Sequence, residues 1–240
     1  MKITAISDIH GSLIQIDPTD LLIIAGDWSP LEIQTDIWYM REWVEDCLLH
    51  WFKEIPADKI IFIAGNHDFI CDPNFYASLG VPDITFKKNI LDQYLKNQDL
   101  TKKVVYLENS SVKYKGYKIF GTPYVEGCRG WAFSQGETKG VYKSIPKCDI
   151  LITHQPPIFG RVGVTKINGV ECELGSWSLT ESILKNKPNY HFCGHIHEGD
   201  HVPQIYNHPD GKHTQILNCS VKDEEYQVYY KPQIITVPDL

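Results

Sequence analysis

Residues 1–11 read MKITAISDIHG, an apolar run that leads directly into the polar turn Asp8-Ile9-His10. The apolar run over residues 2–7 predicts a short buried strand. Asp8 and His10 are two positions apart, so in an extended segment both side chains point to the same side. A carboxylate and an imidazole on one side form half of a metal site. The same pattern also fits a turn residue beside a surface histidine.

Two further apolar runs end in the same way. DLLIIA, residues 20–25, precedes Gly26-Asp27, and KIIFIA, residues 59–64, precedes Gly65-Asn66-His67-Asp68. The glycine lets a tight turn aim Asp27 inward, where its two oxygens can bind two cations. Taken alone, Asp27 and Asn66 also fit ordinary turn chemistry. Between the two runs, apolar residues recur at helical spacing over residues 34–53, which predicts the helix that connects parallel strands.

The second half of the chain adds two more polar turns. His154 follows the apolar run at 149–153 and precedes two prolines that fix the backbone direction. His195 and His197 follow the run at 190–193 with the spacing of a metal-binding pair. A helix is expected at residues 176–185, and more strands at residues 104–107, 117–120, 214–220, 226–230 and 233–237. This order favours two stacked sheets flanked by helices over one doubly wound sheet.

Five polar turns that each follow an apolar strand are more simply explained by one shared metal centre than by five coincidences. The chain resembles the calcineurin-like metallophosphoesterase superfamily, whose ordered blocks are D-x-H, G-D, G-N-H-[DE], H and G-H-x-H. All five blocks occur here in that order: Asp8-Ile9-His10, Gly26-Asp27, Gly65-Asn66-His67-Asp68, Thr153-His154 and Gly194-His195-Ile196-His197. The stretches THQPP and PNYHFCGHIHEG are most similar to the metallophosphoesterase-domain-containing subgroup, whose relatives include cyclic-nucleotide phosphodiesterases.

The resemblance implies an α/β fold, a four-layer α/β/β/α sandwich of two mixed β-sheets flanked by helices, with residues 1–240 as a single domain. It also implies two divalent cations that share Asp27. One cation would take Asp8, His10, Asp27 and His197. The other would take Asp27, Asn66, His154 and His195. Carboxylate and imidazole ligands without thiolates suit Mn²⁺ best, with Fe, Zn, Ni or Mg as alternatives.

The implied chemistry is hydrolysis of a phosphate ester. Two cations that share a water lower its pKa towards neutrality, and the resulting hydroxide attacks phosphorus in line. His67 is outside the ligand count, so we expect it to act as general acid, with Asp68 orienting its imidazole. Alternatively, both residues only hold their loop. Asn66, His67 and Arg161 are expected to bind the substrate. Two segments are expected to be loops that shape the pocket: residues 126–143 and 156–177.

The sequence is compatible with a phosphodiesterase, a phosphomonoesterase or a non-catalytic scaffold. A phosphodiesterase acting on small nucleotide-like substrates is favoured by the subgroup resemblance. The alternative is a phosphomonoesterase, including a phosphoprotein phosphatase, but those enzymes carry arginines beside the blocks, whereas Trp28-Ser29-Pro30 follows Asp27 here and Asp68 replaces their glutamate. A non-catalytic scaffold would have lost ligands, and this chain has lost none.

The composition limits the partners. The chain has 240 residues, 42% of them hydrophobic, and a formal net charge of −7, which disfavours an extended grip on nucleic acid and leaves a small phosphorylated substrate. Its seven cysteines include no CxxC pair, which indicates reduced thiols. No apolar window has the length of a signal peptide or a transmembrane helix. We therefore expect a cytoplasmic protein that binds no membrane, and the oligomeric state stays open.

Overall fold

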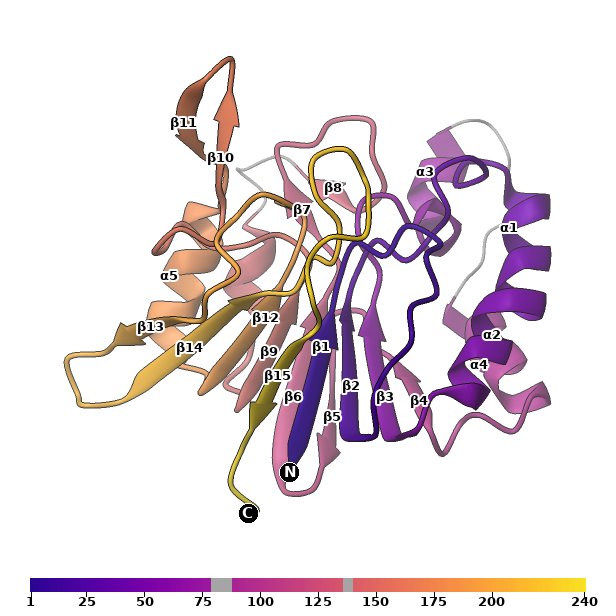
Figure 1. Cartoon of the computed structure of the whole chain (residues 1–240), viewed down its shortest axis with the longest axis horizontal. Helices are drawn as coiled ribbons and strands as arrows, with labels where there is room; N and C mark the ends of the chain where they lie inside the picture. The colour runs from indigo at the N-terminus through magenta and orange to yellow at the C-terminus, as the bar shows by residue number, and fades with distance from the viewer. Residues whose placement is uncertain (79–87, 136–139) are drawn as a thin grey trace.

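In the computed structural model, two β-sheets pack face to face and helices cover the outer face of each (Figure 1). The structure describes residues 1–78, 88–135 and 140–240. The predicted four-layer α/β/β/α sandwich is therefore confirmed. The first sheet contains, in spatial order, β15 (Gln233–Thr236), β1 (Lys2–Ile6), β2 (Thr19–Ala25), β3 (Ala57–Ile63) and β4 (Val104–Tyr106). The second contains β13 (Gln204–Asn207), β14 (His213–Asn218), β12 (Tyr190–Cys193), β9 (Ile150–Thr153), β6 (Tyr117–Thr122) and β5 (Ser110–Tyr114).

The first sheet is parallel from β1 to β4, and β15 adds an antiparallel edge. Its strands are almost continuously apolar because a parallel sheet is buried on both faces. Successive residues of β2 accordingly enter different layers. Leu21 and Ile23 pack between the two sheets, whereas Leu22 and Ile24 pack against the helices. This alternation explains why DLLIIA contains no polar residue after its first position.

The crossover from β2 to β3 is one helical rod that contains a π-helical turn, formed by α1 (Ile37–Trp43), η1 (Val44–Leu48) and α2 (Leu49–Glu54). It begins three residues after the predicted start at residue 34. Asp36 caps it, since its side chain accepts hydrogen bonds from the backbone nitrogens of Trp38 and Tyr39. The buried side chains Met40, Leu48 and Phe52 pack on the outer face of the first sheet.

The outer face of the second sheet is covered by α5 (Trp177–Asn186) and the 3-10 turn η4 (Val141–Ser144). Ser176 caps α5 by accepting from the backbone nitrogen of Leu179. Leu179 and Ile183 then pack against Leu151 of β9. The sheet strands β5 and β13 were not foreseen. Neither were the remaining elements: η2 (Phe69–Cys71), α3 (Pro73–Ser78), α4 (Lys88–Asn97), β7 (Val125–Glu126), β8 (Ser134–Gln135), β10 (Val164–Ile167) and β11 (Val170–Glu173).

Two expectations about the chain path need correction. The strand predicted at residues 226–230 is wrong, because Tyr226 has φ 59° and only the isolated bridge between Lys222 and Val228 is formed there. A strand does not accommodate positive φ. The segment 156–177, expected to be a loop, contains the hairpin β10–β11. The other expected loop, 126–143, contains β8 and the start of η4, and its residues 136–139 lie outside the described residues.

The parallel strands deliver their carboxyl ends to one edge of the molecule. The chain enters β1 at the edge marked N in Figure 1, and the turns after the strands gather at the opposite edge. All seven cysteines carry free thiols. Among the helices of the described ranges, none combines the length and apolar character that crossing a bilayer requires.

Candidate metal centre

The predicted ligands lie in the turns that follow five parallel strands. Asp8 and His10 follow β1, Asp27 follows β2, Asn66 follows β3, and His154 follows β9. His195 and His197 follow β12. Because the two sheets face each other, turns far apart in sequence meet at one edge. All of these side chains are buried except that of His195, which is partly exposed.

The backbone of these turns is unusual. Asp8 has φ 54°, His10 40°, Asp27 54° and His195 70°. Left-handed backbone costs about 1–2 kcal/mol for a residue with a side chain, so the surrounding structure must hold it. The backbone nitrogen of Asp8 donates to Gly26, and that of His10 donates to Asp27, both at 3.0 Å. The expected extended geometry at Asp8 and His10 is therefore wrong. Hydrogen bonds between the two turns, and not strand alternation, bring these side chains together.

Glycines in these blocks leave room for the ligands. A Cβ atom at Gly26 would lie 2.5 Å from Nδ1 of His154, and one at Gly194 would overlap the side chains of Ser7 and Asp8. At both positions the added Cβ atom would therefore lie far inside van der Waals contact. Any side chain at either position would therefore displace a predicted ligand.

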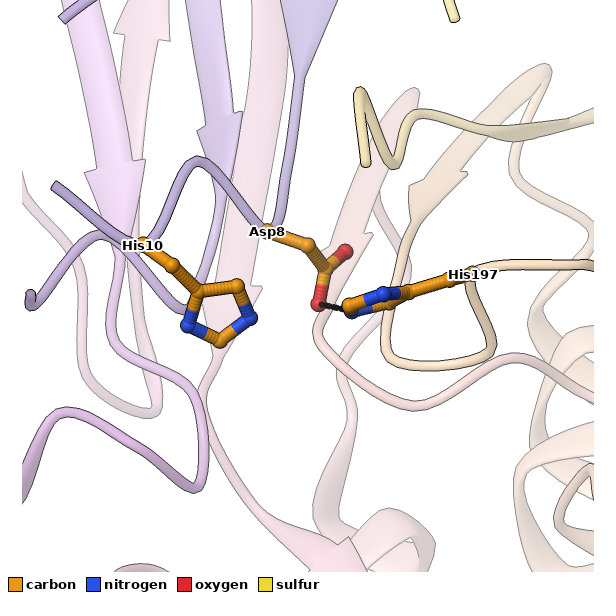
Figure 2. Close-up of side chains that lie close together, drawn as sticks. All are labelled: Asp8, His10 and His197. Atoms are coloured by element: carbon orange, nitrogen blue, oxygen red, sulfur yellow. Dashed lines mark ion pairs between the residues drawn. The ribbon is translucent and has the colours of Figure 1, made fainter. Parts of the chain in front are cut away.

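Asp8, His10 and His197 form the first candidate group, and their ligand atoms lie within 4.8 Å of one another. Figure 2 shows these side chains converging from two loops, with Nε2 of His197 3.4 Å from Oδ1 of Asp8. The other ring nitrogen of His197 donates to the carbonyl oxygen of Asp223 at 2.8 Å, which turns Nε2 towards the centre. Both ring nitrogens of His10 are buried without a hydrogen-bond partner among the described residues. A bound cation would satisfy one of them, so the residues fit a metal ion.

Asp8, Asp27 and His154 form the second group. Nδ1 of His154 donates to the carbonyl oxygen of Ala25 at 2.8 Å. Its Nε2 lies 3.1 Å from Oδ2 of Asp27 and 3.0 Å from Oδ1 of Asn66. Three predicted ligands of the second cation therefore point at one another.

Asp27 belongs to the second group and also lies near His10 of the first. Its Oδ2 atom is 3.1 Å from Nε2 of His154 and 3.9 Å from Nε2 of His10. Its Oδ1 atom accepts from the backbone nitrogen of His67 at 2.8 Å. A carboxylate in this position has both cation sites within reach.

His195 belongs to neither group, although its ring centroid is 5.1 Å from that of His154. Its Nε2 atom lies 3.6 Å from Sγ of Cys128, and its backbone nitrogen donates to Asp8. This leaves Nδ1 as the ring atom available for a cation. No feature of the sequence marks Cys128 as a neighbour of His195, since nearly 70 residues separate them.

His67 is held by a residue that the sequence did not single out. Its Nδ1 atom lies 2.7 Å from Oε1 of Gln34. Its Nε2 atom lies 4.0 Å from Oδ2 of Asp27, and its ring is 4.4 Å from that of Trp131. Nε2 therefore faces the centre as a candidate proton donor. Gln34 was interpreted as the first residue of a helix, and nothing in the sequence distinguishes it from a helix end.

Asp68 does not orient His67, which corrects the expectation from the sequence. Its buried carboxylate accepts hydrogen bonds from one hydroxyl and four backbone nitrogens: Ser29 Oγ and the nitrogens of Asp27, Trp28, Ser29 and Gly65. These donors belong to the turns after β2 and β3. Asp68 therefore fastens the loop of Asp27 to the loop of Asn66, the role that the sequence left as an alternative.

The charges of the centre are coupled. Burial alone would raise the pKa of Asp27, but the imidazoles of His154 and His67 outweigh it and hold that pKa well below its usual value. Burial would lower the pKa of His154, yet the carboxylate of Asp27 raises it to about 9. Burial lowers the pKa of His10 and of His195 to about 4. A cation can replace the proton on His154, since metal ligation requires the neutral imidazole.

Arg161 lies apart from the ligands. Its guanidinium forms two hydrogen bonds with the carboxylate of Glu171 on the exposed β10–β11 hairpin, at 2.7 and 2.9 Å. It lines a cavity of about 430 Å³ together with Glu198, Asp223 and Tyr229. Asp223 of this lining accepts from Nδ1 of His197, so the cavity lies beside the loop of that ligand.

A model of the calcineurin-like phosphoesterase family matches residues 1–199. The chain belongs to this family. Metallophosphoesterase domain-containing protein 1 of Homo sapiens is 30% identical over 99% of this chain and 71% of its own length, and the Mus musculus protein has the same values. A UPF0046 protein of Caenorhabditis elegans is 25% identical over 99% of this chain and 60% of its own length.

Solved structures share the fold of this chain. A solved crystal structure superposes with a TM-score of 0.59 and 13% identity, covering 90% of this chain and 89% of that chain, which is a likeness of fold alone. Calcineurin-like phosphoesterases are dinuclear metal-dependent enzymes, and this chain supplies candidate ligand groups for metal ions. The chain is a phosphoester hydrolase.

Proposed function

We propose that this phosphoesterase hydrolyses phosphodiesters of small, nucleotide-like alcohols. The observation that carries the proposal is the position of His67, whose Nε2 faces Asp27 while its ring packs against Trp131. A general acid beside the cation sites assists the departure of a poor leaving group, which the alkoxide of a nucleotide ester is. The ring of Trp131 is 40% exposed and offers a surface for a base.

The metal-binding proposal assigns all seven predicted ligands. Asp8, His10 and His197 would hold one cation; Asn66, His154 and His195 would hold the other; Asp27 would bridge them. When bound, the two cations supply Lewis acidity and lower the pKa of water. Mn²⁺ is our first candidate because carboxylate, amide and imidazole ligands are mixed. In its imidazolium form, His67 would give its Nε2 proton to the leaving oxygen and keep the hydrogen on Nδ1. Asn66 and Arg161 would contact the substrate.

The charge of the site favours a diester over a monoester. A diester phosphate carries one negative charge and a monoester phosphate up to two. Cationic side chains beside the metal ions would therefore strengthen monoester binding more than diester binding. Here the turn after Asp27 carries Trp28, which is buried against Trp43 and Phe62. Arg161 is paired with Glu171. Monoester hydrolysis, as in a phosphoprotein phosphatase, is therefore the second candidate.

We infer that residues 1–240 act as one catalytic domain and that the substrate is a small molecule and not an extended nucleic acid, given the net charge of −7. The seven free thiols support a reducing compartment such as the cytoplasm.

Paired substrates test the proposal. Protein loaded with Mn²⁺ would be assayed on bis(p-nitrophenyl) phosphate against p-nitrophenyl phosphate, and on cyclic AMP against AMP. We expect a higher kcat/KM for the diester of each pair, and about two equivalents of transition metal per chain by elemental analysis. Faster monoester hydrolysis would replace the proposal with the second candidate. Full activity in metal-free protein treated with chelator would refute the metal centre.

A further inference from the structure

The segment between β14 and β15 forms a turn near the metal centre, seen as the yellow loop near the top of Figure 1. The family match ends at residue 199, so this turn lies outside the matched region. Lys222 and Val228 form an isolated antiparallel bridge at its base. The backbone nitrogen of Tyr229 donates to Val221 at 2.9 Å. The turn is therefore fixed at both ends.

Asp223 connects this turn to a predicted metal ligand. Its carbonyl oxygen accepts from Nδ1 of His197 at 2.8 Å and from the backbone nitrogen of Tyr226 at 3.1 Å. Its side chain accepts from the backbone nitrogens of Glu225 and Gln227. One residue thus sets the position of His197 and the shape of the turn that carries Tyr226.

Tyr226 is held in a costly conformation. Its φ of 59° is left-handed, which costs about 1–2 kcal/mol for a residue with a bulky side chain. Residues of this kind concentrate where the surrounding structure fixes a functional side chain. The left-handed backbone of Tyr226 therefore suits a residue whose phenol ring is held in place for a function.

The ring of Tyr226 lies against two predicted ligands of the same cation. Its centroid is 5.1 Å from that of His10 and 5.0 Å from that of His197, both in edge-to-face geometry. Its hydroxyl has no hydrogen-bond partner within residues 1–78, 88–135 and 140–240, and the residue is 38% exposed. A partly exposed phenol without a protein partner therefore stands beside the group formed by Asp8, His10 and His197.

We propose that Tyr226 is a catalytic residue whose O–H donates a hydrogen bond to a non-bridging oxygen of the phosphoryl group. The inference rests on the proposed function, because it places the phosphate at the cation site of Asp8, His10 and His197. Negative charge on the non-bridging oxygens is stabilised by a fixed donor in the transition state. Tyr226 keeps its proton throughout, so its role differs from that of His67, which gives one to the leaving oxygen.

Tyr226→Phe tests the proposal, since it keeps the ring contacts and removes only the hydroxyl. In Mn²⁺-loaded protein we expect kcat/KM to fall by about 10²-fold, the lower end of the cost of removing one such donor. The loss should be equal for nitrophenyl and alkyl leaving groups, because the donor does not touch the leaving oxygen. Metal content should stay unchanged. Tyr39→Phe, at a 61% exposed position of α1, is the matched control and should leave all values unchanged.

Binding of an oxyanion gives a readout that needs no turnover. Calorimetry with vanadate and the Mn²⁺-loaded protein should show weaker binding in Tyr226→Phe and wild-type binding in Tyr39→Phe. The inference is overturned if Tyr226→Phe keeps kcat/KM and vanadate affinity within twofold, or if it loses metal. A wild-type enzyme that prefers monoesters would refute the diesterase proposal only, since Tyr226→Phe would then be measured on monoesters. Vanadate binding decides the role of Tyr226 whichever ester is preferred.

Discussion

The Oε1 atom of Gln34 lies 2.7 Å from Nδ1 of His67. A carbonyl oxygen only accepts hydrogen bonds, so Nδ1 carries a hydrogen, and Nε2 has a proton to give only in the imidazolium form. Nε2, the other ring nitrogen, faces Asp27 at 4.0 Å. The two ring nitrogens therefore have different roles: Nδ1 fixes the orientation of the ring, and Nε2 is free to face the substrate.

His67→Ala should affect substrates according to their leaving groups. An alkoxide needs a proton to depart, whereas a nitrophenolate leaves without one. We expect alkyl ester hydrolysis to fall by about 10²–10⁴-fold, the usual contribution of general acid catalysis. The loss on nitrophenyl esters should be clearly smaller, and metal content should not change. Equal losses on both substrates would exclude proton donation, and loss of metal would make His67 a ligand or its support.

Gln34→Met should weaken the same step without abolishing it. The thioether fills similar volume but offers only a weak acceptor, so the His67 ring loses its fixed orientation. We expect alkyl ester hydrolysis to fall by about tenfold or more, the effect typical of lost outer partners of a functional imidazole, with little change on nitrophenyl esters. Gln15→Met, on an exposed loop, is the matched control. An unchanged leaving-group dependence would show that Gln34 does not position His67.

Asp27→Asn should damage both cation sites, because Asp27 belongs to the second group and lies 3.9 Å from His10 of the first. His10→Ala removes a ligand from one group only. By elemental analysis we expect less than about one metal per chain in Asp27→Asn and at least about one in His10→Ala, against about two in the wild type. Activity should follow the same order. Equal and mild losses in both variants would contradict the bridging role.

Asp68→Asn should destabilise the protein as well as the centre. An amide NH₂ would face backbone donors that now meet a carboxylate oxygen, leaving buried groups unpaired. The expected loss is about 1–3 kcal/mol for each group left unsatisfied, measured as the free energy of unfolding in urea. Ser29→Ala removes one of the five donors and should cost only about 1 kcal/mol. If Asp68→Asn and Ser29→Ala lost equal stability, Asp68 would not be the residue that holds the loops of Asp27 and Asn66 together.

The environment of His191 makes the stability of the fold depend on pH. Its Nε2 lies 2.8 Å from the Thr153 hydroxyl, which donates to Gln155, so Nε2 carries the hydrogen. Nδ1 is buried without a partner among the described residues, and burial lowers the pKa of His191 to about 3. In the unfolded chain the pKa is about 6.5. Below about pH 6.5 His191 is protonated in the unfolded state but stays neutral in the folded state. The free energy of unfolding therefore falls as pH drops from about 6.5 towards 3.

The measurement compares wild type with His191→Gln in chelator. Between pH 8 and pH 5 the His191 proton alone should cost the wild type about 2 kcal/mol of unfolding free energy. His191→Gln keeps a donor for Thr153 and should lose that share of the pH dependence, whatever its stability at pH 8. His50→Gln, at an exposed position, should behave as the wild type does. An unchanged pH dependence in His191→Gln would show that His191 titrates normally.

The sequence by itself determined the layers of the fold and the members of the metal centre. Apolar runs such as those at 20–25 and 59–64 become β2 and β3 because a strand buried on both faces leaves no place for polar side chains. The residue types Asp, His and Asn after those runs identify metal chemistry wherever the turns lie. The order of the blocks then indicated the family.

Only the tertiary structure decided how those residues are held and what stands around them. The left-handed turns at Asp8 and Asp27 exist because hydrogen bonds between loops offset their backbone cost, and local sequence preferences contain no such contacts. Gln34, Tyr226 and Cys128 lie 33, 216 and 67 residues from the histidines they meet. Since packing of separate elements creates these neighbours, no pattern along the chain could reveal them.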